Sequence, residues 1–149
     1  MKLVPILMAE DDIEDQILVN IALKESKLKN PFLCVNNGKQ LIDYLKRLPP
    51  YEDQEKYPTP GLIILDLNMP VLDGISTLKQ IKASPDWAHL PVIILTTSSE
   101  EEEVVKSYTE GAASYICKPF NLNKLVEIMQ HLGHYWFSIV EIPANEKFN

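Results

Sequence analysis

Basic residues, cysteines and long apolar runs are all scarce in this sequence. Its 149 residues include 14 lysines and arginines against 21 acidic residues, which gives a formal net charge of −7. This surplus of negative charge disfavours sequence-independent attraction to nucleic-acid phosphates or to anionic lipid. No apolar run approaches the roughly 18 residues that a membrane-spanning helix needs. We therefore expect no nucleic-acid partner and no membrane insertion.

The shortage of cysteine argues against a disulfide scaffold. Cys34 and Cys117 lie in apolar, strand-like runs without the CxxC spacing of a metal or redox site. We expect both to be buried thiols that are not cross-linked. At the N-terminus a short apolar run meets three acids, which is typical of a buried strand rather than of a signal peptide. These features together predict a cytoplasmic protein.

What remains is the composition of a compact globule. Hydrophobic residues make up 46% of the chain and charged residues 23%. The length suits one domain, because a single hydrophobic core commonly serves about 100 to 200 residues. We expect one domain over residues 1–149, with a core from about residue 3 to 133 and a C-terminal extension from about residue 134 to 149.

Five strand-like runs alternate with helical segments along the chain. The predicted strands are Leu3–Ala9, Phe32–Asn36, Gly61–Leu67, Val92–Thr96 and Ser114–Cys117. The predicted helices are Asp12–Lys27, Lys39–Leu48, Ile75–Ser84, Glu100–Glu110 and Leu122–Phe137. Three of the strands are continuously apolar instead of alternating, as strands covered on both faces require. The pattern predicts a doubly wound α/β domain, in which helices cover both faces of a parallel sheet.

The first predicted helix carries apolar residues at helical spacing. Ile13, Ile17 and Ile21 share one face, with Val19 and Leu23 nearby. Such a stripe is the usual sign of the face that a helix buries against a sheet. We therefore expect these three isoleucines to belong to the core.

The connecting segments are polar or rich in proline. Leu48–Pro60 holds four prolines, so it cannot continue the preceding helix and should form a long surface connection. The acidic run Glu100–Glu103 follows two serines. Serine caps and early carboxylates suit a solvated helix start, because they complement the helix dipole.

Charged and hydroxyl side chains follow the ends of the predicted strands. They are Glu10, Asp11, Asp12, Asp66, Thr96, Thr97 and Lys118. In an open parallel sheet these strand ends meet at one edge, where ligands bind. Carboxylates gathered there without a cation would repel one another strongly, so the cluster predicts a bound divalent metal. Oxygen ligands favour Mg²⁺, with Mn²⁺ as a possible substitute, over zinc.

The same cluster suggests phosphoryl chemistry. A single acid at a strand end is commonly a helix N-cap, and Asp11 or Asp12 can serve as one. Three strand ends that converge with a lysine and a hydroxyl group favour a reaction site instead. A carboxylate beside Mg²⁺ is a nucleophile able to accept a phosphoryl group. An ammonium and a hydroxyl can then hold the transferred oxygens.

Four motifs at these strand ends resemble a known family. They are AEDD after the first strand, LDLNMPVLDG around Asp66, ILTT ending at Thr97, and YICKPF around Lys118. Together they look like the signatures of response-regulator receiver domains, and the match covers nearly the whole chain. The resemblance implies a flavodoxin-like fold with strand order 2-1-3-4-5. It also implies a single-domain response regulator of a two-component phosphorelay, which accepts a phosphoryl group from a histidine kinase.

The resemblance assigns the metal and phosphoryl positions residue by residue. Asp66 is implied to be the phosphoacceptor. Glu10 and Asp11, together with Asp66, are implied to hold Mg²⁺, and the main-chain carbonyl of Asn68 completes the protein ligands.

The resemblance further implies a switch. Thr96 corresponds to the hydroxyl that turns toward the phosphoryl group, and Lys118 to its ionic partner. Tyr115 falls at the position of an aromatic rotamer switch. The Lys118–Pro119 peptide bond is implied to be cis, an isomer that costs an X-Pro bond only about 0.5 to 1 kcal/mol.

The long connection at 48–60 and the tail HYWFSIVEIP narrow the resemblance. They make the chain similar to the small receivers that serve cyanobacterial phytochromes. This similarity implies a phytochrome-type, light-regulated histidine kinase as the phosphodonor.

Two other functions fit part of the pattern. An aspartate-nucleophile phosphatase or phosphotransferase also uses Mg²⁺, but its DxDxT signature needs a second acid where this chain has Asn68. A flavodoxin-like cofactor binder would need a phosphate-binding loop after the first strand, where Glu10 and Asp11 would repel a phosphate. The sequence therefore favours a signalling protein over an enzyme that turns over an external substrate.

The C-terminal region carries more apolar residues than one domain needs. Leu122, Leu125, Val126 and Met129 already supply a stripe that covers the sheet. Beyond them come Tyr135, Trp136, Phe137, Ile139, Val140 and Ile142. Large apolar side chains left in water mark association sites, and a symmetric dimer is the commonest arrangement. We expect a homodimer through the last helix and tail, the alternative being a tail that folds back on its own domain.

Overall fold

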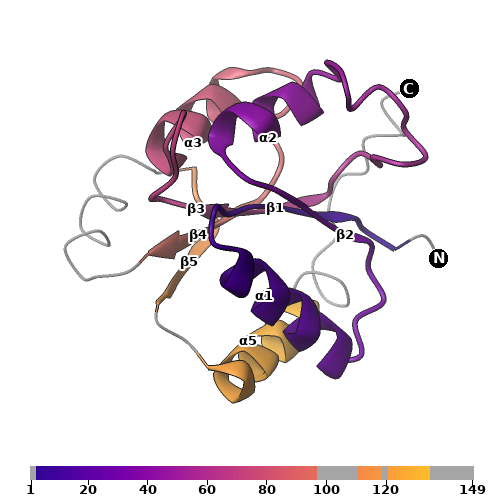
Figure 1. The fold of residues 1–149 in the computed structure, drawn as a ribbon, viewed down its shortest axis with the longest axis vertical. Helices are drawn as coiled ribbons and strands as arrows, with labels where there is room; N and C mark the ends of the chain where they lie inside the picture. Colours follow the sequence, from indigo (N-terminus) through magenta and orange to yellow (C-terminus); the bar gives the residue numbers. More distant parts are fainter. Residues whose placement is uncertain (1–2, 97–110, 119–120, 135–149) are drawn as a thin grey trace.

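The computed structural model describes residues 3–96, 111–118 and 121–134, apart from the side chain of Thr96. These residues form a parallel sheet in the order β2-β1-β3-β4-β5 (Figure 1). The strands are β1 (Ile6–Ala9), β2 (Phe32–Val35), β3 (Leu62–Asp66), β4 (Val92–Thr96) and β5 (Ser114–Cys117). The predicted strand order and the doubly wound fold are confirmed.

The central strands are buried along their whole length. All residues of β1 and β3 are buried, as are the four residues of β4 from Val92 to Leu95. Continuous burial explains the unbroken apolar runs in the sequence, because helices cover both faces of this sheet. Asp66, at the end of β3, pairs in register with Leu95 of β4. The sheet therefore places Asp66 at the end of its middle strand.

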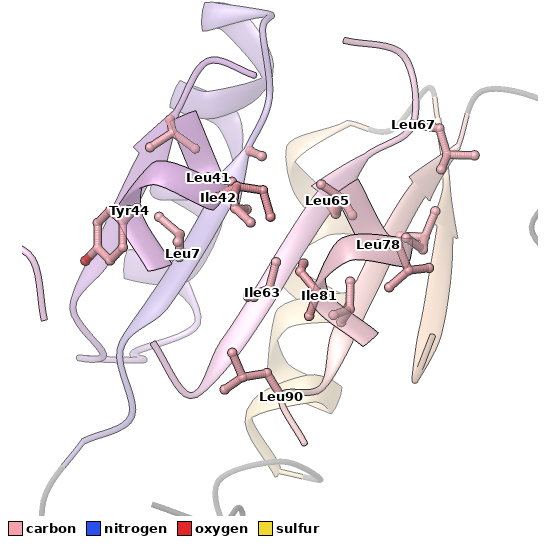
Figure 2. Close-up of a cluster of buried hydrophobic side chains, with 14 residues drawn as sticks. Leu7, Leu41, Ile42, Tyr44, Ile63, Leu65, Leu67, Leu78, Ile81 and Leu90 are labelled. Atoms are coloured by element: carbon pink, nitrogen blue, oxygen red, sulfur yellow. The ribbon is translucent and has the colours of Figure 1, made fainter. Parts of the chain in front are cut away.

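Among the described residues, two helices pack on each face of the sheet. In Figure 1, α2 (Gly38–Leu45) and α3 (Gly74–Ala83) lie on one face, while α1 (Ile13–Glu25) and α5 (Leu122–His134) lie on the other. Figure 2 shows the cluster on the α2–α3 face, where Leu41, Ile42 and Tyr44 of α2 and Leu78 and Ile81 of α3 face Leu7, Ile63 and Leu65 of the strands. The opposite cluster joins α1 and α5 to the other face of the same strands.

The buried face of α1 differs from the prediction. Val19, Ala22 and Leu23 are the buried residues of this helix, whereas Ile13 and Ile17 remain 60% and 53% exposed. Ile21 is also exposed. The expectation that the three isoleucines enter the core was wrong, because α1 carries two apolar stripes at helical spacing and only one can face the sheet.

Local capping sets the helix starts. Asp12 is the N-cap of α1 and accepts a hydrogen bond from the backbone N–H of Glu14 at 2.9 Å. Asn37 caps α2 and Asp73 caps α3 in the same way. Since a cap residue lies outside the helix it serves, α1 begins one residue later than predicted.

The helix ends also fall earlier than the apolar pattern suggested. α1 ends at Glu25 rather than Lys27, and α2 at Leu45 rather than Leu48. Lys27 and Arg47 adopt left-handed conformations, with φ of 62° and 61°. A left-handed residue just beyond the last turn terminates a helix, and this explains both differences.

The connection between α2 and β3 is fastened to the domain by aromatic and cationic side chains. Tyr51 and Tyr57 pack on Tyr44 of α2, with ring centroids 5.2 and 5.7 Å away. Arg47 donates hydrogen bonds to the carbonyl of Tyr57 and, at 2.8 Å, to the hydroxyl of Thr59. The predicted surface connection is therefore held against α2 by these contacts.

Several predictions fall outside the described residues. These are the helix Glu100–Glu110, the Lys118–Pro119 bond, and the tail with Tyr135, Trp136 and Phe137. The structure describes α5 as far as His134, and its predicted continuation to Phe137 also lies outside the described residues.

The cysteines differ in their exposure. Cys34 is partly buried, whereas Cys117 is exposed, so its predicted burial was wrong. Cys117 lies on the edge strand β5, which has a neighbour on one side only within the described sheet. Among the helices of the described residues, none has the length and apolar character needed to cross a membrane.

Candidate functional site

The carboxyl ends of three strands bring the predicted polar residues to one edge of the sheet. Glu10 and Asp11 directly follow β1, Asp66 ends β3, and Lys118 directly follows β5. Because all five strands are parallel, these positions share an edge. Their side chains meet at this edge.

Three carboxylates form the acidic part of the site. Glu10, Asp11 and Asp66 each offer an oxygen, and these oxygens lie within 4.8 Å of one another. Glu10 and Asp66 are buried, with 0% and 2% of their surface exposed, while Asp11 is exposed. Asp11 is therefore the member of the cluster that faces solvent.

Lys118 supplies the positive charge of the site. Its Nζ lies 2.6 Å from Oε1 of Glu10, 2.9 Å from Oδ2 of Asp15 and 3.4 Å from Oδ1 of Asp66. The lysine side chain is only 12% exposed. One ammonium group thus serves three carboxylates, which leaves the cluster with a net negative charge.

The buried Oδ1 of Asp66 has no hydrogen-bond partner, since the 3.4 Å approach of Lys118 is an ion pair rather than a hydrogen bond. A buried carboxylate oxygen without a donor is costly, and a nearby group normally satisfies it. Two further carboxylate oxygens stand beside it. This donor set fits a hard divalent cation such as Mg²⁺ or Mn²⁺, which prefers oxygen ligands.

The protonation of the acids reflects the same crowding. Burial, followed by the neighbouring Asp66, raises the pKa of Glu10 to about 8, against the opposing effect of Lys118. Burial also raises the pKa of Asp66, although Glu10, Lys118 and the backbone N–H of Asn68 counteract the rise. Without a cation, the two carboxyl groups therefore tend to retain a proton between them.

Lys118 itself stays charged. Burial alone would lower the pKa of its ammonium, but hydrogen bonds from it to Glu10 and Asp15 and the charge of Asp66 raise that pKa above the ordinary value. An ammonium that is stabilised as a cation can act as a permanent electrostatic partner for an anion.

The β1 end of the site is anchored by α1. Gln16 Nε2 donates to the carbonyl oxygen of Glu10 and, at 3.1 Å, to Oδ1 of Asn36. Oε2 of Glu10 accepts a hydrogen bond from the backbone N–H of Asp12 at 3.2 Å. Asp12 itself caps α1, so this member of the acidic run has a structural role.

The β3 end of the site depends on a tight turn into α3. The backbone N–H of Gly74 donates to the carbonyl of Leu67 at 3.0 Å. A Cβ atom at Gly74 would lie only 2.3 Å from the carbonyl oxygen of Asp66. Glycine is therefore required there, since any side chain would displace the backbone that carries Asp66.

The other predicted site residues are Thr96, Asn68 and Tyr115. Thr96 ends β4 and pairs in register with Cys117, but its side chain lies outside the described part. Asn68 is exposed just beyond β3. Tyr115 is partly buried in β5 and packs against the α2–α3 side of the core.

Sequence reasoning missed Asp15. It lies in the first turn of α1 rather than at a strand end, so the rule that gathered the other residues did not include it. The sequence offered no signal for it, because an acid in a first helical turn already has a local explanation.

A known protein family matches most of this chain. The family model described as response regulator receiver domain matches residues 6–130. The chain belongs to this family. Response regulator Rcp1 of Synechocystis sp. is 36% identical over 139 residues, which cover 93% of this chain and 92% of that protein.

Solved structures of similar proteins extend this relationship. The phosphorylated cyanobacterial phytochrome response regulator RcpA has a TM-score of 0.83 at 31% identity, with 96% of this chain and 100% of that chain covered. The Mn²⁺-bound form of Rcp1 has a TM-score of 0.79 at 35% identity, with 95% and 99% covered. A response regulator in red light signalling of R. palustris has a TM-score of 0.86 at 30% identity, with 95% and 99% covered.

Proposed function

We propose that this chain is a phosphoacceptor switch in which Asp66 takes a phosphoryl group from a histidine kinase. The observation that carries the proposal is the buried Asp66 oxygen without a hydrogen-bond partner, beside two carboxylates and one lysine. The family membership of the chain supports the same function.

The Asp66 carboxylate is the nucleophile of the proposed reaction. One of its oxygens forms a bond to phosphorus while the bond between phosphorus and the kinase histidine nitrogen breaks, and that electron pair leaves with the imidazole ring. Glu10, Asp11 and Asp66, with the main-chain carbonyl of Asn68, would hold Mg²⁺, or Mn²⁺ in its place. When bound, the cation neutralises charge on the transferring oxygens.

Lys118 and Thr96 are the proposed partners of the product. Phosphorylation replaces one carboxylate charge with a group of about −2 and three acceptor oxygens. The Lys118 ammonium lies 3.4 Å from Asp66 before the reaction and can form an ion pair with such an oxygen. Thr96, at the end of the adjacent strand, can donate a hydroxyl, and Tyr115 of β5 would follow the movement of β4.

A phytochrome-type histidine kinase is the proposed donor. Similar solved structures are described as phytochrome or red-light response regulators, and this supports the assignment. The exposed isoleucines of α1 supply an apolar surface that begins beside Asp12, next to the acidic cluster. A kinase that delivers its phosphohistidine to Asp66 needs such a docking surface close to the site.

We also propose that the protein acts in the cytoplasm and as a homodimer. The proposed dimer surface includes Tyr135, Trp136 and Phe137, which follow α5 in the sequence. Aromatic residues are enriched in protein interfaces, and this composition supports the proposal.

The test is phosphoryl transfer to the purified protein. Incubation with acetyl phosphate or a phosphorylated phytochrome kinase and Mg²⁺ should add one phosphoryl group, seen by intact-protein mass. Asp66→Asn should add none, while the matched control Asp86→Asn, at an exposed loop acid, should match the wild type. Labelling of Asp66→Asn would overturn the assignment. Hydrolysis of an unrelated phosphomonoester such as p-nitrophenyl phosphate would favour the phosphatase alternative.

A further inference from the structure

Asp15 forms an ion pair with Lys118 but has no role in the reaction proposed above. Its Oδ2 lies 2.9 Å from the Lys118 ammonium, closer than the 3.4 Å that separates this ammonium from Asp66. The Asp15 side chain is 23% exposed and the lysine 12%. A partly buried ion pair is screened less by solvent than a surface pair.

Three carboxylates share the charge of the lysine. The Lys118 ammonium lies 2.6 Å from Glu10 and 2.9 Å from Asp15, whereas its 3.4 Å approach to Asp66 is an ion pair without a hydrogen bond. Two of these neighbours belong to the acidic cluster, while Asp15 stands apart on α1. Asp15 therefore pulls the positive charge away from the two carboxylates that face a cation.

The position of Asp15 in the first turn of α1 does not account for this contact. Acids in the first turn commonly stabilise the helix dipole, and Glu14 occupies the same turn. Asp15 is distinguished by its ion pair across the site to the residue after β5. The two neighbouring acids of one turn thus provide a matched comparison.

We propose that Asp15 is a positioning residue, which holds the Lys118 ammonium on the α1 side of the site. This inference rests on the proposed function, because it concerns how Lys118 is shared between the resting protein and the phosphoryl group. In the resting state, Asp15 lowers the competition of Lys118 with a divalent cation for Glu10 and Asp66. During transfer, Asp15 restrains the movement of Lys118 toward the phosphoryl oxygens.

Removal of the Asp15 charge should therefore have two opposite effects. In Asp15→Asn, Lys118 is shared only by Glu10 and Asp66, and one negative charge is lost near the cation. Mn²⁺ and Mg²⁺ should bind about three- to tenfold more weakly, as expected for a unit charge at short range in a partly screened site. At saturating Mg²⁺, however, acetyl phosphate should phosphorylate the variant about two- to fivefold faster, because Lys118 is free to meet the incoming anion.

The acetyl phosphate reaction is balanced by its own leaving group. The Asp66 oxygen forms a bond to phosphorus, the bond from phosphorus to the acetyl oxygen breaks, and acetate leaves with that electron pair. No additional reactant or proton donor is needed, so the rate reports on the groups around Asp66.

The experiment measures free Mn²⁺ by electron paramagnetic resonance and phosphorylation by intact-protein mass. Asp15→Glu should restore wild-type affinity and rate, since it retains the carboxylate. Glu14→Gln removes an adjacent exposed acid and should leave both quantities close to the wild type. In a Lys118→Met background, Asp15→Asn should weaken Mn²⁺ binding less than in the wild type, because the effect acts partly through the lysine.

Three results would overturn the inference: equal Mn²⁺ affinities of Asp15→Asn and Glu14→Gln, a failure of Asp15→Glu to restore the affinity, or a slower reaction of Asp15→Asn at saturating Mg²⁺. The proposed function fails separately, if the wild type binds Mn²⁺ but accepts no phosphoryl group. The affinity comparison and the double-variant cycle still decide the role of Asp15 in that case.

Discussion

At the scale of single residues, several carboxylates of the site share the positive charge of one ammonium group. Glu10 and Asp66 are buried almost completely, and Lys118 contacts both. Repulsion between the acids can be relieved either by a retained proton or by a divalent cation. The protonation of Glu10 and the binding of a cation are therefore alternatives, and this competition leads to a measurable pH dependence.

The first prediction concerns stability without metal. The pKa of Glu10 is about 8 in the folded chain against an ordinary value of 4.5, so the folded state retains the proton longer than the unfolded state. The stabilisation that this retained proton gives to the folded state is complete below pH 4.5 and is lost as the pH rises through about 8. The free energy of unfolding should fall over this window by up to about 1.4 kcal/mol per pH unit for this one proton.

Denaturant unfolding in chelator at pH 5 and pH 8 checks this dependence. Glu10→Gln should flatten it, whereas Glu25→Gln, at an exposed acid at the far end of α1, should leave it unchanged. Added Mg²⁺ should restore more stability at pH 8 than at pH 5, because it binds the ionised carboxylates. A slope that is equal in wild type and Glu10→Gln would contradict the prediction.

The second prediction concerns Val71, in the loop between Asp66 and α3. Val71 has a φ of 69° and is 74% exposed. A β-branched residue in the left-handed region is strained, whereas asparagine adopts this region more readily. Val71→Asn should therefore stabilise the protein by about 1 kcal/mol, seen as a higher denaturant midpoint with an unchanged m-value.

Val71→Ala is the matched comparison for that change. It removes the branched side chain but keeps a Cβ in the left-handed region, so it should stabilise less than Val71→Asn. A lower midpoint for Val71→Asn than for the wild type would show that the valine side chain contributes contacts worth more than its strain.

The residues of the site differ in how far the sequence could predict them. Glu10, Asp11, Asp66 and Lys118 could be located because each stands at or just beyond a strand end, and parallel strands bring these ends together. Asp15 could not, because its partner is distant in the chain and an acid in a first helical turn already has a local explanation. Only the packing of α1 against the sheet shows that it reaches Lys118.

At the scale of elements, α1 shows the limit of apolar periodicity. Its stripe of Ile13, Ile17 and Ile21 has the spacing of a buried face, yet Val19 and Leu23 are the residues in the core. A helix with apolar residues on two sides does not specify its own orientation. Contacts at its N-terminal end add to the packing: Asp12 caps the helix, and Asp15 forms an ion pair with Lys118.

The third prediction uses this exposed stripe. Ile17→Ser should slow phosphoryl transfer from a phytochrome-type kinase about fivefold in kcat/KM, since a partly exposed isoleucine that becomes buried at an interface contributes about 1 kcal/mol. The rate with acetyl phosphate should not change, because this donor needs no docking surface. Comparing both donors separates lost docking from lost chemistry.

Leu48→Ser provides the control for Ile17→Ser. Leu48 is 44% exposed, but it lies after α2 in the connection to β3 rather than on α1. Its substitution should leave transfer from the kinase unaffected. If Ile17→Ser and Leu48→Ser gave the same kinase rate as the wild type, the docking role of α1 would be wrong.

At the scale of the whole molecule, packing and chemistry occupy different parts of one sheet. The apolar runs of β1, β3 and β4 fill two clusters, one under α2 and α3 and one under α1 and α5. The charged residues gather beyond the strand ends, where these clusters stop. Because of this separation, the apolar runs alone predict the sheet. The strand-end residues are a second, independent signal, which predicts the site.

The fourth prediction concerns self-association of the full chain. α5 packs against α1, and its buried residues Leu125, Met129 and Gly133 already complete that side of the core. The apolar residues from Tyr135 to Ile142 are therefore not needed to close the sheet face that α5 covers. Sedimentation should show a dimer for the full chain at micromolar concentration and a monomer after truncation behind His134, which leaves α5 whole.

A combined Tyr135→Ser, Trp136→Ser and Phe137→Ser variant should weaken the dimer without shortening the chain. Thermal unfolding of this variant would show whether its fold is intact. A full chain that stays monomeric at high concentration, both before and after phosphorylation, would exclude the dimer. The apolar residues of the tail would then have to be buried against their own domain.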